Sequence, residues 1–128
     1  MRKITKEAVK AFYNNYNYSK DNTQVRHSGT GSLYTSFFYL HDNLIATKQK
    51  DELIISNCGW FSNTTKERLN GILNYIGNVG IYQKRFQWFL NGEKWNGQRT
   101  KIKISNGRVK LIESQKIKSN GFEYYNIV

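Results

Sequence analysis

The chain has 128 residues, with 20 Lys and Arg against nine Asp and Glu, which leaves a formal net charge of +11. A chain of this length is expected to form one domain that buries roughly two-thirds of its unfolded surface. Cys58 is the single cysteine, so an internal disulfide is excluded. The sequence has no long apolar stretch, so we expect neither a signal peptide nor a membrane span, and a cytoplasmic location is predicted.

The positive charge indicates a polyanionic partner, with nucleic acid first and an anionic membrane surface second. Small domains commonly carry a net charge of magnitude about 2 to 8, so this chain lies outside that range. Solubility alone is the alternative explanation. Asn, Lys, Ile and Tyr are abundant and proline is absent, which an A/T-rich genome would also produce, so part of the lysine excess can arise without a function.

The first predicted element is a short helix over about residues 6–14, with Thr5 as its N-cap. Its apolar stripe consists of Ala8, Val9, Ala11 and Phe12. A short strand is predicted over residues 23–27. The glycine-containing segment 28–32 then predicts a hairpin loop rather than a phosphate cradle, because a strand and not a helix follows it.

Three apolar runs separated by turn residues come next. They span residues 32–40, 43–48 and 52–58 and predict a three-stranded antiparallel meander.

The clearest helix of the sequence is predicted over residues 63–76. Thr64 and Glu67 fit a capping box, Asn63 is a competing cap, and Gly77 is expected to end the helix in the left-handed conformation. An apolar stripe able to cover the meander is formed by Leu69, Ile72, Leu73 and Ile76.

Groups suited to catalysis or metal binding are sparse. The spacing of His27 and His41 matches no zinc motif, Cys58 stands alone, and the acidic residues are scattered. We therefore predict no catalytic residue, no metal site and no cofactor. The least implausible enzyme would be a metal-free nuclease using His, Lys, Arg and Tyr.

Residues 81–90 predict one strand that enters a tight hairpin at Asn91-Gly92. This turn places Trp88 opposite Trp95 on one face of the ribbon. The pair is either packed in the core or an exposed platform for bases flanked by Lys84 and Phe86.

The segment from residue 98 onward is strongly basic, and a turn at Asn106-Gly107 separates its two faces. The apolar face contains Ile102, Ile104, Val109 and Leu111, and the basic face contains Arg99, Lys101, Lys103, Arg108 and Lys110. Lys103 would lie opposite Lys110, so a counter-charge such as a phosphate backbone would relieve their repulsion. An ordinary solvated face is the alternative. A further turn at Asn120-Gly121 and a last strand over residues 122–128 are predicted.

One resemblance is carried by Ile54-Ile55-Ser56-Asn57-Cys58-Gly59-Trp60, Asn63-Thr64-Thr65-Lys66-Glu67-Arg68-Leu69-Asn70 and Ile81-Tyr82-Gln83-Lys84. These segments resemble a family of small tailed-phage proteins without an established activity, over roughly residues 4–97. The resemblance implies expression in a bacterial host cytoplasm. It divides the single predicted domain into a core, residues 1–97, and a basic hairpin extension, residues 98–128.

The sequence thus predicts an α+β fold: an antiparallel sheet built from a meander and hairpins, an amphipathic helix packed on it, and a short N-terminal helix. The predicted function is nucleic-acid binding by a small phage accessory protein. Two alternatives stay open, a phage inhibitor that contacts a host or defence protein directly and a virion-associated structural protein. The predicted nucleic-acid-binding residues are Arg99, Lys101, Lys103, Arg108, Lys110, Lys84, Trp88 and Trp95.

Overall fold

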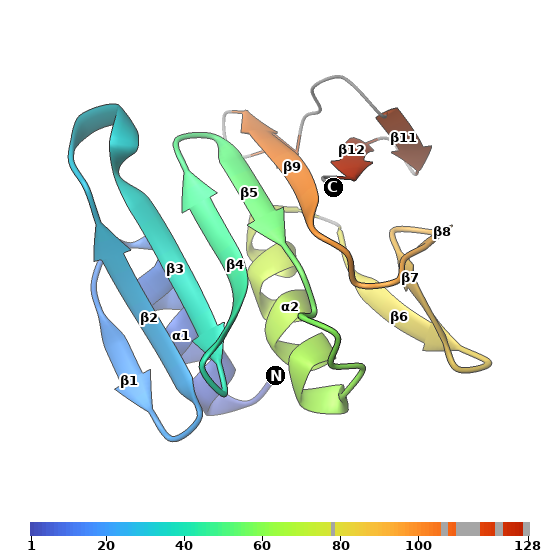
Figure 1. Cartoon of the computed structure of the whole chain (residues 1–128), viewed down its shortest axis with the longest axis horizontal. Coiled ribbons are helices and arrows are strands. Elements are labelled where there is room, and N and C mark those ends of the chain that lie inside the picture. Colours follow the sequence, from blue (N-terminus) through green and yellow to red (C-terminus); the bar gives the residue numbers. More distant parts are fainter. Residues whose placement is uncertain (78, 106–107, 110–115, 120–121, 127–128) are drawn as a thin grey trace.

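Two α-helices and two antiparallel sheets make up the described part of the chain (Figure 1). The computed structural model describes residues 1–77, 79–105, 108–109, 116–119 and 122–126, with their side chains as far as Ile104. The helices are α1 (Lys3–Tyr13) and α2 (Asn63–Ile76). The predicted α+β fold is confirmed.

The larger sheet takes its strands from both ends of the chain. Its strands are β1 (Tyr18–Lys20), β2 (Thr23–Ser28), β3 (Thr35–Leu40), β4 (Asn43–Gln49), β5 (Glu52–Ile55), β9 (Thr100–Ser105), β10 (Arg108–Val109), β11 (Lys116–Ser119) and β12 (Phe122–Asn126). Their spatial order is β1-β2-β3-β4-β5-β9-β12-β11, and β10 pairs with β9. The smaller sheet has the order β6 (Ile81–Lys84), β7 (Gln87–Leu90) and β8 (Glu93–Lys94).

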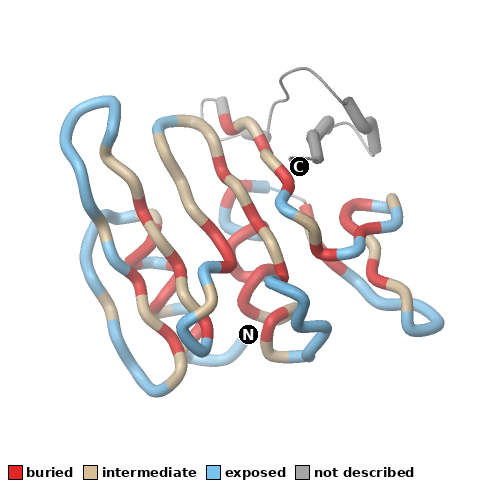
Figure 2. Tube along the Cα trace, viewed as in Figure 1, coloured by how far each residue is buried: buried red, intermediate tan, exposed pale blue. Residues whose placement is uncertain are grey.

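Both helices lie behind the larger sheet in Figure 1, so the opposite face of this sheet is turned toward the viewer. Burial alternates along the strands accordingly, as the red and tan segments of Figure 2 show. The side chains buried against the helices include Val25, Phe38, Leu40, Ile45, Leu53, Ile55 and Ile102. From α2, the predicted stripe of Leu69, Ile72, Leu73 and Ile76 is buried as expected. Sheet and helices therefore share one apolar core.

The ends of α2 differ from the prediction. Ser62, not Thr64 or Asn63, is the N-cap, and its hydroxyl accepts a hydrogen bond from the Thr65 backbone N–H at 3.1 Å. Gly77 is extended, with φ 160° and ψ −166°, rather than left-handed. The capping box is wrong because Glu67 is engaged elsewhere, in contacts with α1.

Those contacts also explain why α1 begins earlier than predicted. Thr5 is not its cap but a buried residue inside the helix, which starts at Lys3. The Thr5 hydroxyl donates to Glu67 and accepts from Arg68 Nη1 at 2.8 Å. Bonds between the two helices therefore replace the predicted local cap.

The meander is confirmed by β3, β4 and β5, with shorter outer ends than expected. Residues Gly31–Leu33 form a 3-10 helix, so β3 begins at Thr35, and β5 ends at Ile55. The hairpin at Asn91-Gly92 is also confirmed, because Leu90 pairs with Glu93. The strand predicted over residues 81–90 is wrong: it is broken by a turn at Arg85 and Phe86, where φ is 52° and 66°.

β9 lies inside the larger sheet, between β5 and β12. Its Ile102 and Ile104 are buried, so the segment after residue 97 supplies a strand of the core. The register about the predicted Asn106-Gly107 turn is confirmed for Ser105 with Arg108 and for Ile104 with Val109. Lys110 and Leu111, whose predicted partners are Lys103 and Ile102, lie outside the described part, as do residues 106–107, 120–121 and 127–128.

Candidate nucleic-acid interface

Trp88 and Trp95 are neighbours, as predicted, but they belong to the core. Their ring centroids are 6.3 Å apart, and their exposed fractions are 1% and 0%. The rings of Phe61 and Trp88 meet in a T-shaped contact with centroids 5.1 Å apart, and Trp95 Nε1 donates to Thr100 Oγ1 at 2.8 Å. Neither indole presents a free face to a base, so both are removed from the predicted interface.

The structure does not bring Lys84 together with the basic residues of β9. Lys84 is exposed at the end of β6, in the smaller sheet, where it pairs with Gln87. Lys101 and Lys103 belong to the larger sheet.

Lys101 and Lys103 do lie on the same face of β9, opposite buried Ile102. Each meets an acidic neighbour from β5 or from the turn before it. Lys101 Nζ lies 3.8 Å from Glu52 Oε1, and Lys103 Nζ lies 3.0 Å from Asp51 Oδ2. The Lys103 hydrogen bond lowers the pKa of the Asp51 carboxyl. The sequence predicted that phosphates would neutralise these lysines. In the structure, Glu52 and Asp51 supply part of that negative charge.

Arg99, immediately before β9, is exposed. Of the remaining predicted basic residues, the side chain of Arg108 and all of Lys110 lie outside the described part of the structure.

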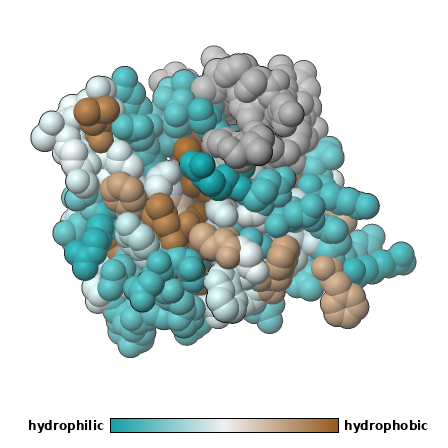
Figure 3. Space-filling model, in the orientation of Figure 1, coloured by the Kyte–Doolittle hydropathy of each residue, from teal (hydrophilic) through white to brown (hydrophobic). Residues whose placement is uncertain are grey.

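We use the name open face for the side of the larger sheet turned away from the helices. It is formed by alternate residues of neighbouring strands, Arg26, Phe37, Tyr39, Leu44, Thr47, Glu52, Ile54, Lys101 and Lys103, with Arg99 at its margin. Figure 3 shows this side of the molecule: apolar residues gather near its centre and hydrophilic residues surround them.

Two aromatic rings of β3 are the part of this face that the sequence reasoning missed. Phe37 and Tyr39 are partly exposed, and their ring centroids are 6.4 Å apart with an interplanar angle of 21°. Arg26 is the cross-strand partner of Phe37 in β2. A cation thus lies across the strand from one of two near-parallel rings, an arrangement suited to stacked bases and their phosphates.

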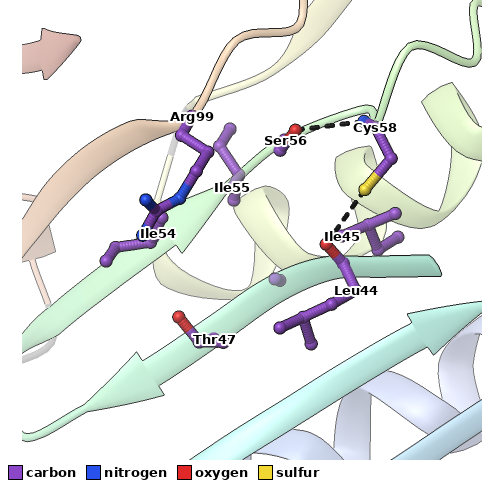
Figure 4. A pocket seen from close by; sticks show the side chains of 9 residues that line it. Leu44, Ile45, Thr47, Ile54, Ile55, Ser56, Cys58 and Arg99 are labelled. Carbon is purple, nitrogen blue, oxygen red and sulfur yellow. Dashed lines mark hydrogen bonds between the residues drawn. The ribbon is translucent and has the colours of Figure 1, made fainter. Parts of the chain in front are cut away.

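A shallow pocket of about 200 Å³ lies between β4 and β5 (Figure 4), and the cross-strand partners of the two rings, Thr47 and Leu44, belong to its lining. Leu44, Thr47 and Ile54 line it from the sheet, and the side chain of Arg99 reaches over Ile54. Cys58 is exposed at its end and donates through Sγ to the Leu44 carbonyl at 3.1 Å. The pocket joins an apolar floor to one guanidinium, which suits a planar, negatively charged ligand.

The two histidines are accounted for by local structure. His27 Nε2 lies 3.2 Å and 3.0 Å from the carbonyls of Ala11 and Tyr16, so it donates, and Nδ1 accepts from the Ser36 hydroxyl at 2.8 Å. His41 sits in the β3–β4 turn with φ 49°. Among the described residues, no three His, Cys, Asp or Glu side chains gather in a group that could hold a metal ion. Within the same residues, neither helix has the length and apolarity needed to cross a bilayer.

Fold and site together define a small α+β protein whose antiparallel sheet is covered by helices on one face and carries aromatic and basic side chains on the other. The family described as Kyanoviridae Gp96 protein matches residues 1–110, so the chain belongs to this bacteriophage family. The match extends past residue 97 and includes β9. Comparisons with curated proteins and with solved structures give no match.

Proposed function

We propose that the protein binds single-stranded nucleic acid on the open face of its larger sheet. The observation that carries this proposal is the pair of partly exposed rings, Phe37 and Tyr39, beside the Arg26 cation. Aromatic side chains on a solvent-facing sheet stack on unpaired bases whatever their identity, because every base has a π-face.

The distribution of charge supports the same ligand. Arg26 and Arg99 are exposed on either side of the apolar centre of the open face, and Lys101 lies between Arg99 and Lys103 along the chain. Because the centre of this face is apolar, it suits bases laid face down with their phosphates toward these cations. A closed duplex offers no free base faces to such a surface.

Titration of a labelled oligothymidylate or oligouridylate, followed by fluorescence anisotropy, tests the proposal. Phe37→Ala and Tyr39→Ala should each weaken binding by about 1 to 3 kcal/mol if each ring stacks on one base. Tyr16→Ala is the matched control, because Tyr16 is an exposed aromatic after α1, outside the open face. The proposal fails if the wild-type protein does not bind at low salt. It also fails if Phe37→Ala and Tyr39→Ala bind no more weakly than the control Tyr16→Ala.

We further propose that binding occurs without hydrolysis, since His27 is held by three protein groups. The oligonucleotide should therefore be recovered intact after long incubation. Cleavage that is lost in His27→Ala or His41→Ala would instead establish the metal-free nuclease.

Direct contact with a host or defence protein is the second candidate, and one observation favours it. Trp60 and Phe61 are both exposed, side by side in the loop before α2. Exposed aromatic residues are enriched in protein interfaces. A partner recovered from infected cells that survives nuclease treatment and is lost in Trp60→Ala would support this function.

A further inference from the structure

The tip of the β6–β7 hairpin carries the most exposed large apolar side chain among the described residues. Phe86 is 95% exposed, between Lys84 and Arg85 on one side and β7 on the other. Figure 1 shows this hairpin projecting beyond the larger sheet, at the lower right. Burial therefore does not explain why an apolar residue stands here.

Turn geometry does not explain it either. Arg85 and Phe86 have φ values of 52° and 66°, a left-handed pair that favours Asn and Gly and disfavours bulky side chains. The very next hairpin of the chain uses Asn91 and Gly92, with φ 50° and 95°, for the same geometry. Residues 85 and 86 are thus poorly suited to their turn, and such strain is found where a side chain is needed for function.

The base of the hairpin is firmly held. Ile81, Trp88 and Leu90 are buried, and the Ile81 backbone exchanges two hydrogen bonds with the side chain of Asn70 on α2. The base of the hairpin is therefore rigid and holds the exposed tip in one position. A side chain that inserts into a ligand needs such a rigid base.

The chemistry of the tip favours a polyanion. Residues 81–90 contain Lys84 and Arg85 and no acidic residue. Apolar side chains that enter nucleic acid act as wedges between bases while neighbouring cations contact phosphates. A pocket on a protein partner would also accept a phenyl ring. Such a pocket does not require the two cations, Lys84 and Arg85, that precede Phe86 in the chain.

We propose that Phe86 inserts between two bases of the bound nucleic acid, while Lys84 and Arg85 contact the flanking phosphates. This inference rests on the proposed function for its ligand, but it concerns a second surface, in the smaller sheet. The hairpin would fix the position of a strand that the open face holds by stacking.

Two substitutions at one position separate a binding role from a structural one. Phe86→Gly gives the turn the glycine that Gly92 provides in the neighbouring hairpin, so it should raise the melting temperature while weakening oligothymidylate binding by about 5- to 150-fold. Phe86→Trp retains a stacking face and should keep the affinity. Leu33→Ala is the matched control, since Leu33 is an exposed apolar residue in the β2–β3 connection; it should change neither property.

Photocrosslinking to an oligonucleotide containing 5-iodouracil identifies the contact directly. We expect an adduct on Phe86 that disappears in Phe86→Gly, while adducts on Phe37 or Tyr39 persist. If Phe86→Gly binds as tightly as the wild type and the open-face adducts remain, the proposed insertion of Phe86 is overturned and the proposed function stands. If the wild type binds no nucleic acid, both fail. Loss of a protein partner in Phe86→Gly with unchanged nucleic-acid binding would also overturn the wedge.

Discussion

The side-chain amide of Asn70 and the backbone of Ile81 exchange two hydrogen bonds: Asn70 Nδ2 donates to the Ile81 carbonyl at 2.8 Å, and the Ile81 N–H donates to Asn70 Oδ1 at 2.6 Å. An amide side chain on α2 thus takes the place of a neighbouring strand for the first residue of β6. Because Ile81 is buried, its peptide groups have no water to replace these bonds.

Asn70→Ala should therefore lower the free energy of unfolding by about 1 to 3 kcal/mol, because buried backbone groups lose their partners. Hydrogen exchange of the Ile81 amide should accelerate more than that of the amides in β3. Asn74→Ala is the control, since Asn74 is an exposed residue of the same type on the same helix. Equal losses in the two variants would contradict a specific anchor at residue 70.

The orientation of α2 gives a second prediction. Leu73 is fully buried against the sheet, so Leu73→Ala should cost about 2 to 5 kcal/mol of stability through lost burial and the cavity that remains. Lys66→Ala removes only a contact between Lys66 Nζ and Gln83 at 3.1 Å and should cost little. Denaturant unfolding of both variants measures the difference, and similar midpoints would argue against this orientation.

Periodicity predicted the buried stripe of α2 correctly because packing on a sheet requires one continuous apolar face. It could not rank the caps, because Ser62, Asn63 and Thr64 are all suitable N-cap residues. Glu67, the acid of the predicted capping box, is bound instead to Thr5, which lies 62 residues away in sequence. Local sequence carries no information on that contact.

The same limit applies to the candidate site. Alternation in β9 predicted that Lys101 and Lys103 share a face, but not that Asp51 and Glu52 would meet them, since β5 and β9 are distant in sequence. In β3, aromatic residues occupy both faces, so the pattern alone could not show which rings stay exposed. The positions of the helices decide that Phe38 is buried and Phe37 is not.

Glu67 lies beside the buried guanidinium of Arg68, and we expect this pair to make the stability of the fold decrease in acid. Burial opposes ionisation of Glu67, but hydrogen bonds from Thr5, the Arg2 backbone N–H and Arg68, together with the attraction of Arg68, outweigh it and lower the pKa of the Glu67 carboxyl. The unfolded chain, with the ordinary pKa of 4.5, then binds more protons than the folded one. The Glu67 contribution is complete above this value and is lost as pH falls through the lowered pKa.

Glu67→Gln should accordingly lower stability by about 1.5 to 3 kcal/mol near neutral pH and flatten its decline in acid. Thermal unfolding measured between neutral and acidic pH provides the test. Glu93→Gln, which removes a carboxylate of β8 outside this network, is the control. An unchanged acid decline in Glu67→Gln would show that other carboxylates cause it.

Tryptophan emission distinguishes the core pair from the exposed indole. Trp88 and Trp95 are buried, whereas Trp60 is 59% exposed. Saturating oligonucleotide should therefore leave the emission of Trp60→Phe unchanged, and any quenching of the wild type should come from Trp60. Trp88→Ala should cost about 3 to 5 kcal/mol of stability, as expected of a core residue. Quenching that persists in Trp60→Phe would mean that the core pair is reached by the ligand.

The acids that face the β9 lysines should compete with nucleic acid for them. Both ion pairs are partly exposed, so Asp51→Asn with Glu52→Gln should cost little stability while freeing Lys101 and Lys103 to contact phosphates. We expect tighter binding of a single strand and a log-log salt dependence that is steeper by about 0.7 to 1.4 units, for one or two additional phosphates. Asp21→Asn with Asp42→Asn changes the net charge equally, at turn positions with positive φ that asparagine tolerates. If the two double variants steepen the salt dependence alike, total charge and not the open face governs binding.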